Sequence, residues 1–120
     1  MQNLNYVMNN PCLAQALNSL SSGGKEHITP FGPNSFINKQ RHRIQRFSNG
    51  WINSATRETF MPFGNGSISS TGKRVSIFGS GLITNDSRRV ANPFGTGILS
   101  SNGKQWHSFG NGILTQGSIL

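Results

Sequence analysis

The chain has 120 residues, of which 33% are hydrophobic and 12% charged, and its 11 Lys and Arg against 3 Asp and Glu give a net charge of +8. It contains no run of about 20 apolar residues, which excludes a membrane-spanning helix, and its single cysteine, Cys12, excludes an internal disulfide or a cysteine-based zinc site. The opening residues MQNLNYVMNN do not resemble a signal peptide, and the composition assigns no compartment. The basic excess predicts an anionic partner.

Residues 1–30 are predicted to form an N-terminal segment with one short helix. Asn10 is a suitable N-cap, Pro11 fits the first turn, and Gly23-Gly24 would stop the helix. One apolar stripe follows from Leu13, Leu17 and Leu20. We expect this helix to cap an open end of the β structure that follows, or to dock on a partner subunit.

Residues 31–120 repeat with a period of 15 or 16. Each unit begins with a phenylalanine, at Phe31, Phe47, Phe63, Phe78, Phe94 and Phe109. With Phe as position zero, glycine dominates positions one and three, position seven is small or polar, and position ten is basic in every complete unit. Position five is always apolar: Phe36, Ile52, Ile68, Ile83, Leu99 and Leu114. The segment therefore forms one repeat domain of five full units and a truncated sixth.

Each unit is predicted to form a β-hairpin, followed by a reversal at Phe-Gly-x-Gly. Two-residue turns are expected at Asn102-Gly103, Thr71-Gly72 and Asp86-Ser87. This register places Leu99 opposite Trp106, Ile68 opposite Val75 and Ile83 opposite Val90, and it makes position five the core position. Ile83→Asp should then collapse the fold, whereas Thr84→Asp should be tolerated.

Two all-β arrangements are compatible with the repeat. In a β-solenoid, equivalent residues stack about 4.8 Å apart, whereas in a meander of hairpins they lie two strands apart. Ladders of Phe, Gly and Ile favour a small solenoid-like stack, and the Asn-Gly turns favour a meander sheet. We expect the solenoid-like stack, with Phe63, Phe78, Phe94 and Phe109 as structural ladder residues.

The residue types needed for catalysis are sparse. The carboxylates Glu26, Glu58 and Asp86 lie in separate segments, the three histidines are widely spaced, and Cys12 lies on an apolar stripe. The glycine-rich segments do not match a phosphate-binding loop or a dinucleotide fingerprint. The sequence therefore predicts no enzymatic activity, no catalytic or metal-binding residue and no cofactor.

The clearest functional pattern is the basic residue at position ten. Arg41, Arg57, Lys73, Arg88 and Lys104 occupy it, and Arg74 and Arg89 extend it. We expect these side chains to fall on one edge and to bind a polyanion, either nucleic acid or an anionic polysaccharide. The alternative is that they only keep the sheet soluble and discourage edge pairing.

Two functions remain open. The first is a non-enzymatic structural protein, a self-associating β-repeat subunit of a filament or larger particle whose partners are copies of itself. The second is a polyanion-binding module that uses the basic positions. The hairpins resemble choline-binding and WG-type repeats in their aromatic-glycine turns, but Trp occurs in only two units, and no family is assigned.

Overall fold

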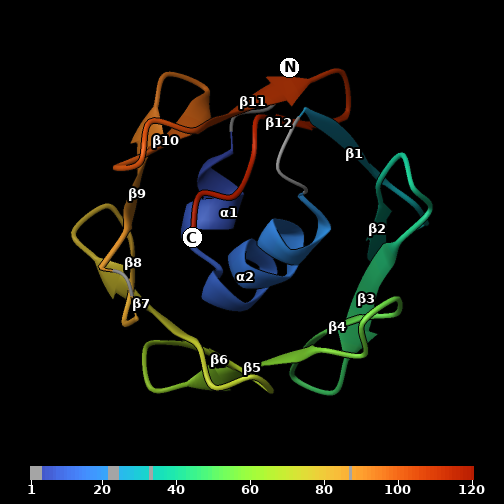
Figure 1. Cartoon of the computed structure of the whole chain (residues 1–120), viewed down its shortest axis with the longest axis horizontal. Coiled ribbons are helices and arrows are strands. Elements are labelled where there is room, and N and C mark those ends of the chain that lie inside the picture. The colour runs from blue at the N-terminus through green and yellow to red at the C-terminus, as the bar shows by residue number, and fades with distance from the viewer. Residues whose placement is uncertain (1–3, 22–24, 33, 87) are drawn as a thin grey trace.

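The computed structural model of the protein describes residues 4–21, 25–32, 34–86 and 88–120. It consists of a ring of twelve strands with two helices in its lumen (Figure 1). The helices are α1 (Asn5–Met8) and α2 (Pro11–Leu20). The strands are β1 (Glu26–Pro30), β2 (Ser35–Ile37), β3 (Arg43–Phe47), β4 (Gly50–Asn53), β5 (Thr59–Phe63), β6 (Gly66–Ser69), β7 (Arg74–Phe78), β8 (Gly81–Thr84), β9 (Val90–Phe94), β10 (Gly97–Ser100), β11 (Gln105–Phe109) and β12 (Gly112–Thr115).

The strands form a closed antiparallel barrel. Each strand pairs with the next one in the chain, and β12 pairs with β1, with Thr115 opposite Glu26. The all-β prediction and the repeated hairpins are confirmed, but neither an open solenoid-like stack nor an open meander sheet is formed. Closure leaves the described strands without an unpaired edge, which is the feature that makes an open sheet prone to aggregate.

The sixth repeat unit is shared between the two ends of the chain. It lacks its second strand in the sequence, and β1 supplies this strand beside β12. Residues 26–30, which the sequence assigned to the N-terminal segment, are therefore part of the barrel wall. The barrel consists of six equivalent hairpin units.

The Phe-Gly-x-Gly segments make tight turns at one end of the barrel. Gly79 has a φ of +61°, a backbone conformation that glycine adopts without a steric penalty. Gly81 serves a different purpose, because a Cβ there would lie 2.0 Å from the carbonyl oxygen of Ala91 on the next strand. Phe78 lies directly opposite Gly81 and covers it from outside the barrel. The motif thus combines a reversal with a close approach of two strands.

The loops at the other end of the barrel explain the alternation of 15 and 16 residues. In the fifth unit the Ser100 N–H donates to the Lys104 carbonyl, whereas in the fourth the Thr84 N–H donates to the Arg89 carbonyl, so the loop is one residue longer. The predicted two-residue turn at Asn102-Gly103 is wrong, since β10 ends at Ser100 and β11 begins at Gln105.

The prediction of position five as the core position is confirmed only in the first unit, where Phe36 packs against the core, and is wrong in the other five units. Ile83 is half-buried on the outer face, whereas its neighbours Leu82 and Thr84 are buried and face the lumen. The expected tolerance of Thr84→Asp is therefore not supported. Of the three predicted apolar pairs, only Ile83 with Val90 occurs. The other two are displaced by one residue, because Ile98 lies opposite Trp106 and Ser67 lies opposite Val75.

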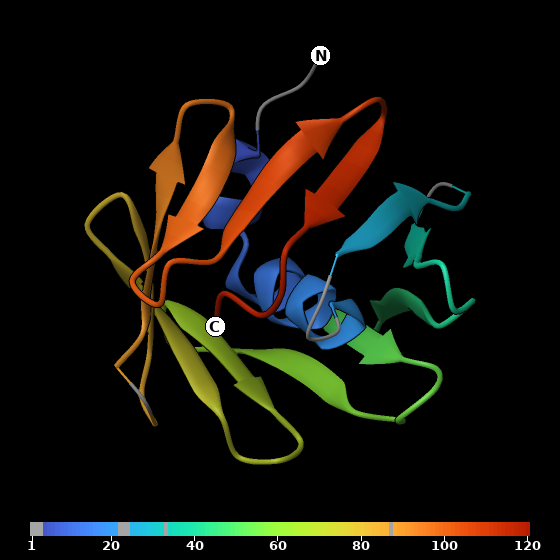
Figure 2. The same cartoon turned by 45° about the horizontal axis from the view of Figure 1, so that its top comes forward.

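Helix α2 fills the lumen instead of capping an end of the sheet (Figures 1 and 2). Its predicted start is confirmed: Asn10 Oδ1 accepts a bond from the Leu13 N–H at 3.2 Å, and Pro11 occupies the first turn. Seven of its ten residues are buried. Eight strands already enclose a space just wide enough for side chains, so a twelve-stranded barrel needs an additional element inside. The predicted stop at Gly23-Gly24 lies outside the described residues.

The hydrophobic core is the interface between this helix and the inner wall. Helix α2 packs against β3 to β7, and Trp106 and Ile119, both fully buried, contribute to the same core cluster. Neither helix of the described residues has the length and apolar character required to cross a membrane.

Candidate polyanion-binding end of the barrel

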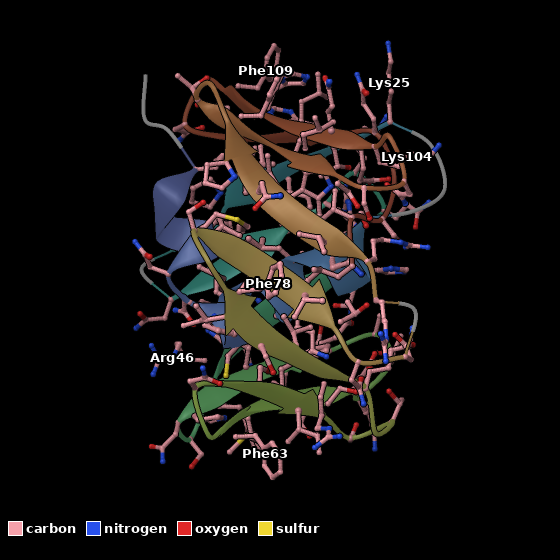
Figure 3. All side chains as sticks on the ribbon, turned by 90° about the vertical axis from the view of Figure 1, so that its left-hand side faces the viewer. Lys25, Arg46, Phe63, Phe78, Lys104 and Phe109 are labelled. Carbon is pink, nitrogen blue, oxygen red and sulfur yellow. The ribbon has the colours of Figure 1, made fainter. Side chains whose placement is uncertain are left out.

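The two ends of the barrel differ in charge. We call the end that carries the loops from even-numbered to odd-numbered strands the basic end. Of the 11 Lys and Arg residues, only Arg46 lies at the opposite end, as Figure 3 shows by its separation from Lys25 and Lys104. The basic end holds Lys25, Lys39, Arg41, Arg43, Arg57, Lys73, Arg74, Arg88, Arg89 and Lys104.

One cation recurs at an equivalent place in all six units. Five are the predicted position-ten residues, and the sixth is Lys25, just before β1. Together they form the cation ring: Lys25, Arg41, Arg57, Lys73, Arg88 and Lys104. All six are exposed. The sequence interpretation began at Phe31 and therefore missed Lys25, which lies six residues before Phe31 just as Arg41 lies six before Phe47.

The backbone at the cation ring takes one of two forms. Arg41, Arg57 and Arg88 have positive φ values of 66°, 63° and 53°. In the third and fifth units a glycine adopts this conformation, and the lysine follows it: Gly72 precedes Lys73 and Gly103 precedes Lys104. The same offset from Phe therefore gives a cation in each loop, although the loops differ.

Buried polar side chains hold these loops in shape. In the second to fifth units the residue before position seven is buried, and its oxygen accepts bonds from the loop backbone; in the first unit Asn38, at position seven itself, takes this place. Asn53 Oδ1 accepts from Ala55 N–H at 2.9 Å, and Thr84 Oγ1 accepts from Arg89 N–H at 3.0 Å. Position seven itself bonds across to the adjacent strand, as where Ser101 Oγ accepts from Val90 N–H at 3.1 Å. The cation ring is therefore carried by loops whose backbone is fixed by hydrogen bonds.

Arg74 and Arg89 have surroundings that differ from those of the ring. Arg74 is exposed at the start of β7, and its guanidinium carbon lies 5.6 Å from the centroid of the Phe63 ring. Arg89 is half-buried, and its Nη1 donates to the Leu120 carbonyl at 3.2 Å. Arg89 therefore helps to fix the C-terminal residues, while Arg74 remains available on the outer wall.

Residues 116–120 turn inward at the basic end and lie over part of the lumen (Figure 1). The Trp106 indole N–H donates to the Gly117 carbonyl at 2.8 Å, and Ser100 Oγ donates to the Ile119 carbonyl at 2.9 Å. From the helix, Asn18 Oδ1 accepts the Ile119 N–H at 2.9 Å. The cation ring therefore surrounds an end of the barrel at which α2 and the C-terminal residues are joined to the wall by hydrogen bonds.

Two carboxylates at this end support the loops. Glu26 is 2% exposed, and its Oε2 accepts the Lys39 N–H at 2.9 Å. Glu58 Oε2 accepts the Thr71 hydroxyl at 3.1 Å. Both carboxylates therefore stabilise the loops through hydrogen bonds. Cations still outnumber carboxylates at the basic end by a wide margin.

The residues considered for catalysis or metal binding are not brought together. Within the described part of the chain, no group of three His, Cys, Asp or Glu side chains could hold a metal ion. Cys12 is buried in the core on α2, and burial raises the pKa of its thiol, an effect that Ser67 and Arg46 oppose. A thiol kept neutral in this way is a poor nucleophile.

Comparison with models of known protein families, with curated proteins and with solved structures gives no match. The fold defines the protein as a small closed β-barrel with a helical plug and one basic end.

Proposed function

We propose that the protein is a polyanion-binding module and that the cation ring is its contact surface. The observation that carries this proposal is the recurrence of an exposed cation in all five loops at one end of the barrel, with Lys25 before β1 as the sixth. Ten of the 11 Lys and Arg residues lie at this end, against three carboxylates, and surfaces that only keep a protein soluble usually carry the two signs in closer balance.

The spacing of the cation ring favours a polymer over a small anion. Equivalent loops lie two strands apart, or about 10 Å, which is too far for one phosphate to bridge two neighbouring cations. A chain of phosphates or sulfates can contact several of them at once, and nucleic acid presents a charge every ~3.4 Å along each strand. At about 10 Å in water the repulsion between ring members is only ~0.4 kcal/mol, so the ring forms at little cost.

The backbone at the ring arginines also supports the proposal. A left-handed conformation costs a residue other than glycine about 1–2 kcal/mol. Glycine occupies the corresponding place in the third and fifth units, where the cation comes one residue later. The turn itself therefore does not require Arg41, Arg57 or Arg88, and strained residues of this kind gather at functional sites.

The test is a binding titration with labelled single-stranded DNA, duplex DNA and heparin over a range of salt concentrations. We expect log K to fall linearly with log salt for all probes that bind, with a slope of about −0.9 per duplex phosphate neutralised. Lys104→Gln should reduce the duplex slope by about 0.9, and Arg46→Gln, the same loss of charge at the opposite end, should leave it unchanged. Equal effects of the two variants would show that net charge alone, and not the ring, governs binding.

Self-association, the other hypothesis from the sequence, cannot occur by adding strands to an open end of the sheet. Growth by strand addition requires an unpaired strand edge, and the described strands form a closed ring. Any association between copies would have to use the outer wall or an end of the barrel.

A further inference from the structure

The outer wall carries one phenylalanine in each unit at the same height. We call Phe31, Phe47, Phe63, Phe78, Phe94 and Phe109 the phenylalanine belt; all are between 47% and 54% exposed. Figure 3 shows Phe63, Phe78 and Phe109 directed away from the barrel, at one level between Arg46 and Lys104. The belt therefore encircles the barrel between its two ends.

Contacts with the barrel wall cover only part of the surface of each phenylalanine in the belt. Five of them lie opposite the position-three glycine of the following strand, as Phe94 lies opposite Gly97. The remaining half of each ring faces solvent. Since a phenylalanine side chain of this kind can bury 150–250 Å², the six rings together leave about 600 Å² of apolar surface uncovered. This area is divided among the six units at roughly 100 Å² each, so it forms a band of small apolar surfaces around the barrel rather than one contiguous patch on a single face.

The position of the belt limits what can cover it. Polar residues form the tips of the turns beyond it, among them Asn49, Asn65, Ser80, Thr96 and Asn111, and the cation ring lies on its other side. Insertion into lipid up to the belt would bury these polar tips and their backbone, which is costly. A partner on one side would leave most of the belt exposed. The belt is covered best by several neighbouring barrels, each of which places its own belt against it.

We propose that the phenylalanine belt is a self-association surface through which copies of the protein pack side by side into a laterally extended assembly. The contact between two barrels involves only the rings on facing sectors, far less than the ~800 Å² per partner of a stable pairwise complex. Pairs are therefore weak, and the assembly grows because each barrel has several neighbours.

The charge distribution sets the direction of neighbouring barrels. Side-by-side copies with the same direction would place their basic ends together, whereas copies with opposite directions separate these ends and still align their belts. The Cα extents of 31 × 28 × 23 Å predict the dimensions of the assembly. Since packed sheets lie ~10 Å apart, neighbouring barrel axes should be about 40 Å apart.

The experiment is sedimentation velocity of the whole protein from about 10 μM to about 1 mM, the range in which weak contacts are populated. We expect the wild-type sedimentation coefficient to rise with concentration. The variant Phe63→Thr/Phe78→Thr/Phe94→Thr, which keeps only half of the belt, should associate much less than the wild type and form no species larger than small oligomers. The control Gln45→Thr/Ser76→Thr/Asn92→Thr, which changes three other outer-wall residues, should associate like the wild type. Circular dichroism establishes that each variant is folded, and the single variant Phe94→Thr should give a smaller loss of association if the triple variant does not fold.

A wild-type protein that stays monomeric at about 1 mM, or a folded triple variant that associates equally well, would overturn the proposal. So would flotation of the wild type with phosphatidylserine vesicles that the triple variant loses, in the absence of self-association, because this would make a lipid surface the occupant. Higher salt should preserve association through the belt and weaken polyanion binding. The failure of either proposal can thus be distinguished from that of the other.

Discussion

The inner and outer faces of the barrel wall are made by the same strands but follow different rules. On the outer face, phenylalanine recurs in all six units, and an exposed cation recurs in the five loops of the basic end and before β1. On the inner face, three positions before each phenylalanine, the side chains differ widely in volume: Ile28, Ile44, Phe60, Val75, Ala91 and Trp106. The repeat is therefore regular where it meets solvent and irregular where it meets the plug.

The reason for this difference is the asymmetry of the plug. Six equal hairpins enclose a lumen with six similar sectors, but α2 lies against β3 to β7 and α1 approaches β9. Each inner side chain must fill the space left in its own sector, because interiors are packed as densely as organic crystals. The outer face has no such constraint, so whatever is constant there reflects the hairpin itself or a shared external contact.

The largest difference is expected when the same charged residue is placed at neighbouring positions on the two faces. Leu82→Asp places a charge in the lumen and should destabilise the protein by about 4 kcal/mol or more. Ile83→Asp, on the outer face, should cost about 1 kcal/mol. Urea unfolding of both variants measures the difference, and similar losses would show that the two faces are not distinct.

A second test compares two glycines in one turn. Gly81→Ala introduces a Cβ 2.0 Å from the Ala91 carbonyl oxygen and should cost about 3 kcal/mol, since backbone must move. A Cβ at Gly79 meets nothing within 4 Å, so Gly79→Ala should cost only the ~1 kcal/mol of its left-handed conformation. Thermal unfolding would contradict the assignment if Gly79→Ala were the more damaging change.

A third test uses a substitution expected to stabilise the protein. Arg88→Gly places a glycine at the left-handed position, as the third and fifth units have, and should stabilise the fold by about 0.5 kcal/mol. It also removes one member of the cation ring, so binding of duplex DNA should weaken. A gain in stability together with a loss of affinity would separate the functional contribution of Arg88 from its structural one, whereas unchanged affinity would remove Arg88 from the contact surface.

The smallest effect is expected at Cys12, which reports on the inner face without changing it. Burial raises the pKa of this thiol, so the neutral form persists to higher pH in the folded protein than in the unfolded chain. Its contribution to stability is therefore present below the pKa of the unfolded thiol and is lost as pH rises through the folded value. Alkylation by iodoacetamide should be at least about tenfold slower in the native protein than in denaturant. Equal rates would mean that the plug leaves the lumen readily.

The sequence predicts the outer face well and the inner face poorly. The repeat period, the hairpins and the common end of the basic residues all follow from residues that recur in every unit. Position five was mistaken for the core because it is apolar in every unit. The positions that actually face the lumen hold small residues such as Ser67 and Ala91 as well as the large Trp106. Residues that recur identify what the units have in common, whereas the residues that form the core differ from one unit to the next.

Closure and the plug could not be derived from the sequence for a further reason. Ring closure depends on accumulated strand twist and tilt, which no single unit encodes. Strand β1 was also hidden, because its unit begins at Phe109 near the other end of the chain. Counting back from Phe31 to Lys25 is the one signal that would have revealed it.

The pairing of β1 with β12 has a consequence for the order of folding. All other strand pairs join neighbours in the chain and can form as local hairpins, whereas Glu26 and Thr115 are separated by almost the whole wall. The plug comes first in the chain and must already lie inside when this last seam forms. Hairpins can therefore assemble around the helix one after another in microseconds, and we expect the single non-local step, the meeting of the first strand with the last, to set the rate at which the native protein appears.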